Sequence, residues 1–196
     1  MSNIDILRTQ ALELKQKGLS QREIADELHL SSTAVEWLLG PKKSSQGAPP
    51  DVRIGWRSLG VYPRRTRYLA QALADIAREE LHGKQVDCVI GVAINGISLA
   101  TYVAEEMGLE LSVYRALDEE KKKGTFGANF ASIKGKNCIL VDDVLGTGAT
   151  LAGAIDMLKK EGGKAVLALV VVNKRSEDFV GDVKVRGLIR TLAVHC

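Results

Sequence analysis

The feature that most restricts the fold is a series of near-continuous apolar runs separated by segments of helical character. The runs have the length of strands and span residues 86–92, 110–117, 136–144 and 164–174. The first and third runs lead through small-residue turns into apolar stretches at helical spacing, which end near Gly108 and Gly163. Strands that are apolar on both faces are typical of a parallel sheet covered by helices. We therefore predict an α/β fold with a central, mostly parallel sheet.

A second feature is a short stretch of different composition that separates two parts of the chain. The stretch GPKKSSQGAPPD at residues 40–51 is rich in Gly, Pro, Ser and Lys, which do not continue a helix and offer little to pack. It separates the α/β region from a helical segment at the N-terminus. We predict an N-terminal domain over residues 1–40, a linker over 41–51 and an α/β domain over 52–196.

The N-terminal segment has the pattern of three short helices. Apolar residues at three- and four-residue spacing define a first helix that stops at Gly18. Ser20 and Glu23 form a capping-box pattern at the start of a second helix, and a third begins near Ser31. The turn between them is short, and His29 within it is of a type that tolerates positive φ. This arrangement resembles a DNA-binding helix-turn-helix.

The third helix supplies the predicted DNA-reading face. Its polar residues and Trp37 are expected to point away from the apolar side, where they can reach base edges, and Arg22 and Lys42–Lys43 can neutralise phosphates. One module with so few basic residues binds duplex DNA weakly, so we expect a homodimer with two reading helices roughly 34 Å apart. The alternative is a three-helix module for protein interaction or dimerisation. The residues predicted to bind DNA are Arg22, Ser31, Ser32, Thr33, Glu36 and Trp37.

The stretch ILVDDVLGTGAT, residues 139–150, carries the chemistry of the α/β region. It lies where a strand ends, which is where parallel sheets bind ligands. Gly146 and Gly148 remove side-chain bulk, so that main-chain amides and the start of the next helix can hold a phosphate. Asp142 and Asp143 would repel that phosphate unless they bind another part of the ligand. Carboxylates accept hydrogen bonds from ribose hydroxyls, directly or through Mg²⁺, so the pattern favours a phosphorylated ribose over an acidic turn that merely caps a helix.

This stretch resembles the signature with which type I phosphoribosyltransferases bind 5-phosphoribosyl 1-diphosphate (PRPP). It is unlike a Walker A loop, which requires Gly-Lys-Ser/Thr. The resemblance implies the type I phosphoribosyltransferase fold and no fixed metal ligand, with Mg²⁺ held through the ligand near Asp142 and Asp143. It assigns the ribose and phosphate contacts to Asp142, Asp143, Val144, Leu145, Gly146, Thr147, Gly148, Ala149 and Thr150.

The resemblance extends over residues 50–196. GVAINGISLA resembles the family's pyrophosphate loop, which implies main-chain contacts at Ala93, Ile94, Asn95 and Gly96 and a strained or cis peptide among them. EEKKKGTFGANF resembles the flexible loop that closes over the substrate, with positive charge from Lys121, Lys122 and Lys123 and hinges at Gly124 and Gly127. VRIGWRSLG and VVNKRSED are similar to segments that orotate phosphoribosyltransferases use around the base, with Arg175 at a base-contacting position.

The sequence departs from the orotate enzymes in three respects. Ala116 replaces a lysine that reaches the pyrophosphate, the closing loop lacks their acidic and histidine pattern, and Gly146 replaces threonine or alanine. The attached helix-turn-helix also suits a sensor better than a biosynthetic enzyme. The layout resembles archaeal phosphoribosyltransferase-like transcription regulators, whose family role is control of sugar catabolism genes. This implies a DNA-binding regulator that senses PRPP or a related ligand. The alternative is an active, Mg²⁺-dependent orotate-type phosphoribosyltransferase with an accessory helix-turn-helix.

Composition limits the cellular context. The longest apolar run, Ala165 to Val172, is too short to span a bilayer, and the N-terminus lacks a signal-peptide apolar region, so we expect a cytoplasmic protein without membrane partners. The cysteines, Cys88, Cys138 and Cys196, have no metal-ligand spacing and are expected to be reduced structural thiols.

Overall fold

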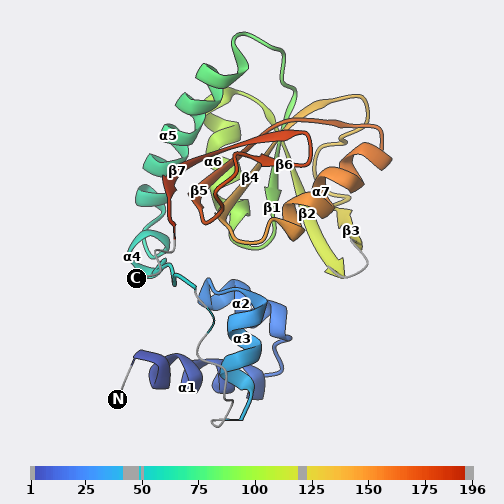
Figure 1. Cartoon of the computed structure of the whole chain (residues 1–196). Coiled ribbons are helices and arrows are strands. Elements are labelled where there is room, and N and C mark those ends of the chain that lie inside the picture. The colour runs from blue at the N-terminus through green and yellow to red at the C-terminus, as the bar shows by residue number, and fades with distance from the viewer. Residues whose placement is uncertain (1–2, 42–48, 50, 119–122, 193–196) are drawn as a thin grey trace. The chain divides into compact units, whose positions relative to one another are not determined.

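The computed structural model describes residues 3–41, 49, 51–118 and 123–192 (Figure 1). The chain divides into two compact units, with a boundary between Trp56 and Arg57. Most of the predicted linker, residues 42–48 and 50, lies outside the described residues. Among the described residues, no helix is both long and apolar enough to cross a membrane.

The first unit contains three helices, as the sequence predicts: α1 (Asn3–Gln16), α2 (Gln21–Leu28) and α3 (Ser32–Leu39). The capping box is present, because Ser20 Oγ accepts from the Glu23 N–H at 3.3 Å and the Glu23 carboxylate accepts from the Ser20 N–H at 2.8 Å. A small apolar core joins the helices through Ala11, Ile24, Ala25, Leu28, Val35 and Leu38.

The turn between α2 and α3 is closed by a left-handed residue, as expected. His29 has φ 51° and ends α2, and its ring stacks on Trp56 with centroids 5.7 Å apart. Ser31 then caps α3 by accepting from the Ala34 N–H at 3.1 Å, while its own N–H donates to Asp51 at 2.7 Å. Asp51 and Trp56 therefore belong structurally to the three-helix unit.

The second unit is built on a seven-stranded sheet with the order β3-β2-β1-β4-β5-β7-β6. The five strands β2, β1, β4, β5 and β7 are parallel, and β3 and β6 are antiparallel at the two edges. This confirms the mostly parallel sheet. The strands are β1 (Cys88–Val92), β2 (Glu110–Asp118), β3 (Lys123–Phe126), β4 (Asn137–Leu145), β5 (Lys164–Asn173), β6 (Phe179–Val180) and β7 (Val183–Arg190).

Helices cover both faces of the sheet (Figure 1). The helices α5 (Pro63–Leu81) and α6 (Gly96–Met107) pack against each other on one face, with the short α4 (Arg57–Gly60) next to α5. The helix α7 (Ala149–Lys160) packs against β2, β3 and β5 on the other face. The central strands are buried on both sides, which explains their near-continuous apolar runs.

Two of the three cysteines lie in this core. Cys88 on β1 and Cys138 on β4 are register partners, and both are free and buried. A hydrogen bond between the two thiols lowers the pKa of Cys88 and raises the pKa of Cys138. The prediction of reduced structural thiols is confirmed for this pair, and Cys196 lies outside the described residues.

Candidate functional site

Three loops meet at the carboxyl edge of the sheet. They follow β1, β4 and β5, which are neighbours in the sheet. The chain passes from β1 through α6 to β2 on one side, and from β4 through α7 to β5 on the other. The crevice between β1 and β4 is therefore the topological switch point, where open α/β sheets bind ligands.

The loop after β1 rests directly against β4. A Cβ at Gly96 would lie 2.4 Å from the main-chain oxygen of Val141 and 3.2 Å from Oδ1 of Asp142. Only glycine permits this approach, so the predicted pyrophosphate loop and the acidic pair adjoin. The Ala93–Ile94 peptide is cis, which confirms that expectation, and the Ile94 side chain is exposed.

The acidic pair lies within β4, which continues to Leu145. Asp142 is half-buried and Asp143 is buried. Oδ1 of Asp142 accepts from the Asp143 N–H at 2.8 Å, and Oδ1 of Asp143 accepts from the Val144 N–H at 2.7 Å. The main chain therefore orients both carboxylates at the edge where the loops meet.

Of the predicted phosphate loop, residues 144–150, the first two residues end β4 and the last two begin α7, so the loop itself is residues 146–148. Gly148 has φ +86° and is the N-cap residue of α7, which receives no side-chain cap from it. Thr147 Oγ1 instead accepts from the Ala149 N–H at 3.3 Å. The start of a twelve-residue helix thus faces a loop with little side-chain bulk, which is an arrangement suited to an anion.

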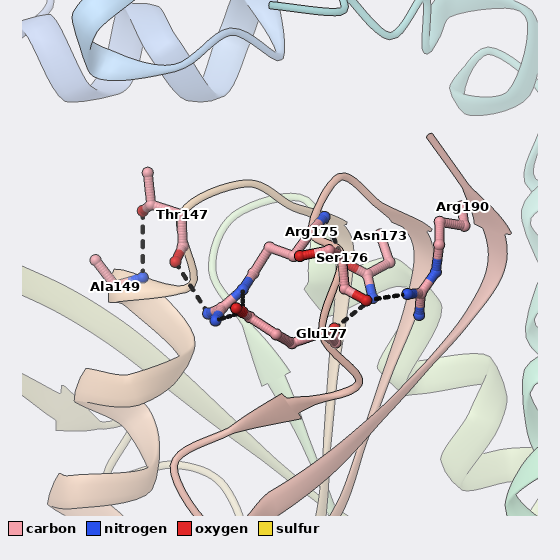
Figure 2. A network of polar contacts seen from close by, with 7 residues as sticks. All are labelled: Thr147, Ala149, Asn173, Arg175, Ser176, Glu177 and Arg190. Carbon is pink, nitrogen blue, oxygen red and sulfur yellow. Dashed lines mark hydrogen bonds and ion pairs between the residues drawn. The ribbon is translucent and has the colours of Figure 1, made fainter. Parts of the chain in front are cut away.

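Arg175, in the segment after β5, lies over this loop (Figure 2). Its Nη1 donates to the main-chain oxygen of Thr147 at 3.2 Å, and its Nε donates to Glu177 at 3.1 Å, with Nη2 also bound to Glu177. The sequence placed Arg175 on the base side of the ligand. The structure brings it next to the phosphate loop as well, so one guanidinium links the segment after β5 to the loop after β4.

Two residues that hold Arg175, namely Asn173 and Glu177, were not singled out as site residues by the sequence reasoning. Asn173 is buried at the end of β5, and its Oδ1 accepts from the Arg175 N–H at 2.9 Å. Its Nδ2 donates to the main-chain oxygen of Glu177 at 3.3 Å. The signal was available, because an amide side chain ends an otherwise apolar run at the carboxyl edge of the sheet.

Part of the predicted flexible loop is instead a strand. Lys123–Phe126 forms β3 and pairs with β2, and the ring of Phe126 contacts that of Tyr114. Gly124 is a packing position rather than a hinge, because a Cβ there would lie 2.2 Å from the Tyr114 hydroxyl. Lys121, Lys122 and the Lys123 side chain lie outside the described residues.

The structure exposes part of the face that the sequence predicts to read DNA. Ser32, Thr33 and Glu36 are exposed on α3, and Ser31 is its N-cap. The sequence predicted that Trp37 points away from the apolar side, and this prediction is wrong. The Trp37 side chain is half-buried against the three-helix core, and the Arg8 guanidinium lies 5.4 Å from its ring centroid. The ring reaches the core because Trp37 adjoins the buried Leu38 at the margin of the apolar face.

The basic residues of the three-helix unit are placed as follows. Arg22 pairs with Asp26 at 3.6 Å, so its charge is partly neutralised. Lys42 and Lys43 lie outside the described residues.

An open groove of about 630 Å³ lies elsewhere in the second unit. It is lined by Phe126, Phe130 and Lys134 and by Lys160 at the carboxyl end of α7. The phosphate loop is at the opposite end of α7, so this groove is separate from the candidate site. No group of three or more His, Cys, Asp or Glu side chains able to hold a metal occurs in the described part of the chain.

The fold and the edge loops define a phosphoribosyltransferase-type domain, here preceded by a three-helix unit. Residues 56–189 match the phosphoribosyl transferase domain family. Among solved structures, orotate phosphoribosyltransferase from Aeropyrum pernix is similar with a TM-score of 0.58 and 24% identity, over 75% of this chain and 82% of that one. The enzyme from Mycobacterium tuberculosis H37Rv in complex with PRPP is similar with a TM-score of 0.56 and 17% identity, over 70% of this chain and 80% of that one. These likenesses confirm the fold.

Relatives that match almost the whole chain are more specific. It is 45% identical to the transcriptional regulator GfcR of Thermoplasma acidophilum, over 99% of this chain and 98% of the relative. It is 42% identical to GfcR of Picrophilus torridus, over 99% of this chain and the full length of the relative. The chain belongs to the family of archaeal GfcR transcriptional regulators, which confirms the resemblance seen in the sequence.

Proposed function

We propose that this chain is a DNA-binding transcriptional regulator whose α/β domain senses PRPP or a closely related phosphorylated ribose. The observation that carries the proposal is the meeting of the loops after β1, β4 and β5 at the switch point of the sheet, with Gly96 against Asp142 and Arg175 against Thr147. Each loop matches a different part of one ligand.

The ligand parts are assigned by chemistry. Asp142 and Asp143 accept hydrogen bonds from the ribose hydroxyls, and the main chain of residues 144–150 holds the 5-phosphate beside the start of α7. The main chain of residues 93–96 holds the pyrophosphate. Mg²⁺ prefers oxygen ligands and is commonly bound through one or two carboxylates together with substrate phosphates. The acidic pair fits that role, with the ion supplying charge neutralisation to the pyrophosphate.

We assign DNA binding to the three-helix unit. Ser32, Thr33 and Glu36 form an exposed polar surface on α3, with the donors and acceptors that base edges require. A homodimer presents two such helices to one face of the duplex, and its symmetry is then mirrored in the operator. Regulation requires that the ligand bind the DNA-competent and DNA-incompetent forms with different affinity. DNA binding must then change the affinity for the ligand by the same factor.

A binding screen of the purified chain against genomic DNA fragments, with and without Mg²⁺–PRPP, tests this proposal. We expect selected fragments whose affinity changes when PRPP is added. The variant Asp142→Asn/Asp143→Asn should select the same fragments without responding to PRPP. Selective binding that is the same in all four conditions would refute the sensing role, and no selective binding at all would refute DNA recognition.

A turnover assay separates sensing from catalysis. Ala116, at the position of the pyrophosphate-contacting lysine in the orotate enzymes, pairs with Gly124 in the β2–β3 hairpin and supplies no ammonium. We therefore expect no nucleotide formation from orotate, adenine or hypoxanthine with PRPP at an ordinary enzymatic rate. Formation at such a rate would show that the chain is an active phosphoribosyltransferase.

A further inference from the structure

The charge balance of the three-helix unit leaves DNA binding incompletely explained. Residues 1–56 contain seven Lys and Arg residues and seven Asp and Glu residues, so this unit has no formal excess of positive charge. Most non-specific DNA affinity, and a large share of specific affinity, comes from neutralising phosphates. Further phosphate contacts must therefore come from another part of the chain if it binds duplex DNA with useful affinity.

The second unit begins with a surface that has the required charge. Residues 57–74 contain four arginines and no acidic residue. Arg57, Arg64 and Arg65 are exposed, as are Tyr62 and Tyr68 beside them. We call these five residues, which lie on α4, at the N-cap of α5 and in its first turns, the α5 basic surface.

Two of the three guanidinium groups of this surface, those of Arg64 and Arg65, lie against its tyrosines. Arg65 lies 4.5 Å from the ring centroid of Tyr62, and its Nη1 donates to the main-chain oxygen of Ser58. Arg64 lies 5.5 Å from the ring centroid of Tyr68, and its Nε donates to the Tyr68 hydroxyl at 2.7 Å. Stacked, preoriented guanidinium groups lose less side-chain entropy when they bind a phosphate.

Neighbouring arginines on the same helix are neutralised. Arg67 pairs with Glu105 at 2.7 Å, and Arg78 pairs with Glu106 at 3.4 Å. Within the described part of the chain, Arg64 and Arg65 have no such carboxylate partner. The uncompensated charge is therefore concentrated at the start of α5.

We propose that the α5 basic surface binds the phosphate backbone of duplex DNA and supplies affinity that the three-helix unit lacks. The inference rests on the proposed DNA-binding function. Arginine is the side chain best suited to the partner, because its planar fork matches phosphate oxygens. A second copy of the same surface would be repelled by like charge, which favours DNA over self-association through this patch.

Fluorescence titrations of the full-length chain with a labelled duplex of arbitrary sequence, over a range of salt concentrations, test the inference. We expect Arg64→Gln/Arg65→Gln to reduce the log–log salt slope by about 1.8 for each protomer bound, and the affinity at low salt by roughly tenfold. The matched control Arg67→Gln/Arg78→Gln removes the same charge from the same helix, but from ion pairs, and should leave the slope unchanged. The charge-conserving Arg64→Lys/Arg65→Lys should keep most of the slope.

Several results would overturn the inference. One is a log–log salt slope in Arg64→Gln/Arg65→Gln that equals the wild-type slope, and another is a slope in Arg64→Lys/Arg65→Lys that falls as much as in the glutamine variant. A third is a smaller oligomer of Arg64→Gln/Arg65→Gln in sedimentation, which would mark the surface as a subunit interface. A wild-type chain that shows no salt-dependent binding would instead refute the proposed DNA-binding function itself, so the two failures are distinguishable.

Discussion

The Nη1 atom of Arg175 donates a hydrogen bond to the main-chain oxygen of Thr147, which ties the segment after β5 to the loop after β4. The same Nη1 would lie only 2.6 Å from a Cβ on Gly148. Gly148 also has φ +86°, a left-handed conformation that side chains rarely adopt. The loop that we assign to the phosphate is therefore fixed both by its own backbone conformation and by the guanidinium above it.

The first prediction follows from that double constraint. Gly148→Ala should displace the Arg175 guanidinium and strain the loop backbone at φ +86°. PRPP binding should weaken by at least about tenfold, since losing one or two charge-assisted hydrogen bonds costs about 1.5–3 kcal/mol each. Titration calorimetry measures the loss. Gly181→Ala is the matched control, because Gly181 also has positive φ but a Cβ there meets nothing within 4 Å. Gly181→Ala should bind PRPP as the wild type does, and unchanged affinity in Gly148→Ala would contradict the assignment.

The second prediction concerns the contact between the loops after β1 and β4. Gly96→Ala places a Cβ 2.4 Å from the Val141 oxygen, so α6 or β4 must shift. We expect a loss of about 1–3 kcal/mol in the free energy of unfolding of the α/β unit, as for other overpacked sites, measured by denaturant titration. Gly146→Ala, at the same edge with open space around it, should cost much less. Equal stability of the two variants would show that the close contact is absent.

The sequence predicted four of the seven strands, and it missed β3, β6 and β7 and several contacts that arrange the site. The four long apolar runs are strands because they are buried on both faces, and the Ser20–Glu23 pattern marks a helix start whatever surrounds it. The nineteen-residue α5 was missed although its buried residues recur at helical spacing, as in Leu73, Ala77 and Leu81. The four-residue β3 depends on pairing with β2, and the contact of Arg175 with Thr147 joins residues from two loops. Such features arise from tertiary structure, which local sequence does not encode.

The third prediction compares two histidines in the left-handed conformation. His82 ends α5 with φ 47° and is exposed, whereas His29 has φ 51° and stacks on Trp56. Glycine at His82 should raise the free energy of unfolding by about 0.5–1 kcal/mol, because the backbone strain is removed. At His29 the gain should be smaller or reversed, because the ring stacking is lost. Thermal unfolding of His82→Gly and His29→Gly measures both, and a larger gain at His29 would contradict the importance of the stack.

The fourth prediction concerns Glu80 on α5, which binds Lys184 at 2.6 Å and Arg186 on β7. The hydrogen bond from Lys184 lowers the pKa of Glu80 below its usual value of 4.5. A carboxyl group with a lowered pKa in the folded state stabilises the fold above its unfolded pKa, and that contribution is lost as the pH falls through the folded pKa.

The free energy of unfolding of Glu80→Gln should therefore lie below that of the wild type near neutral pH, and the difference should shrink on acidification below about pH 4.5. Denaturant titrations across this pH range measure it. Glu105→Gln is the control, because Glu105 pairs with Arg67 where both side chains are about half exposed, and such pairs contribute little to stability. A Glu80→Gln difference that stays constant down to low pH would mean that the lost stability comes from packing of the side chain and not from its charge.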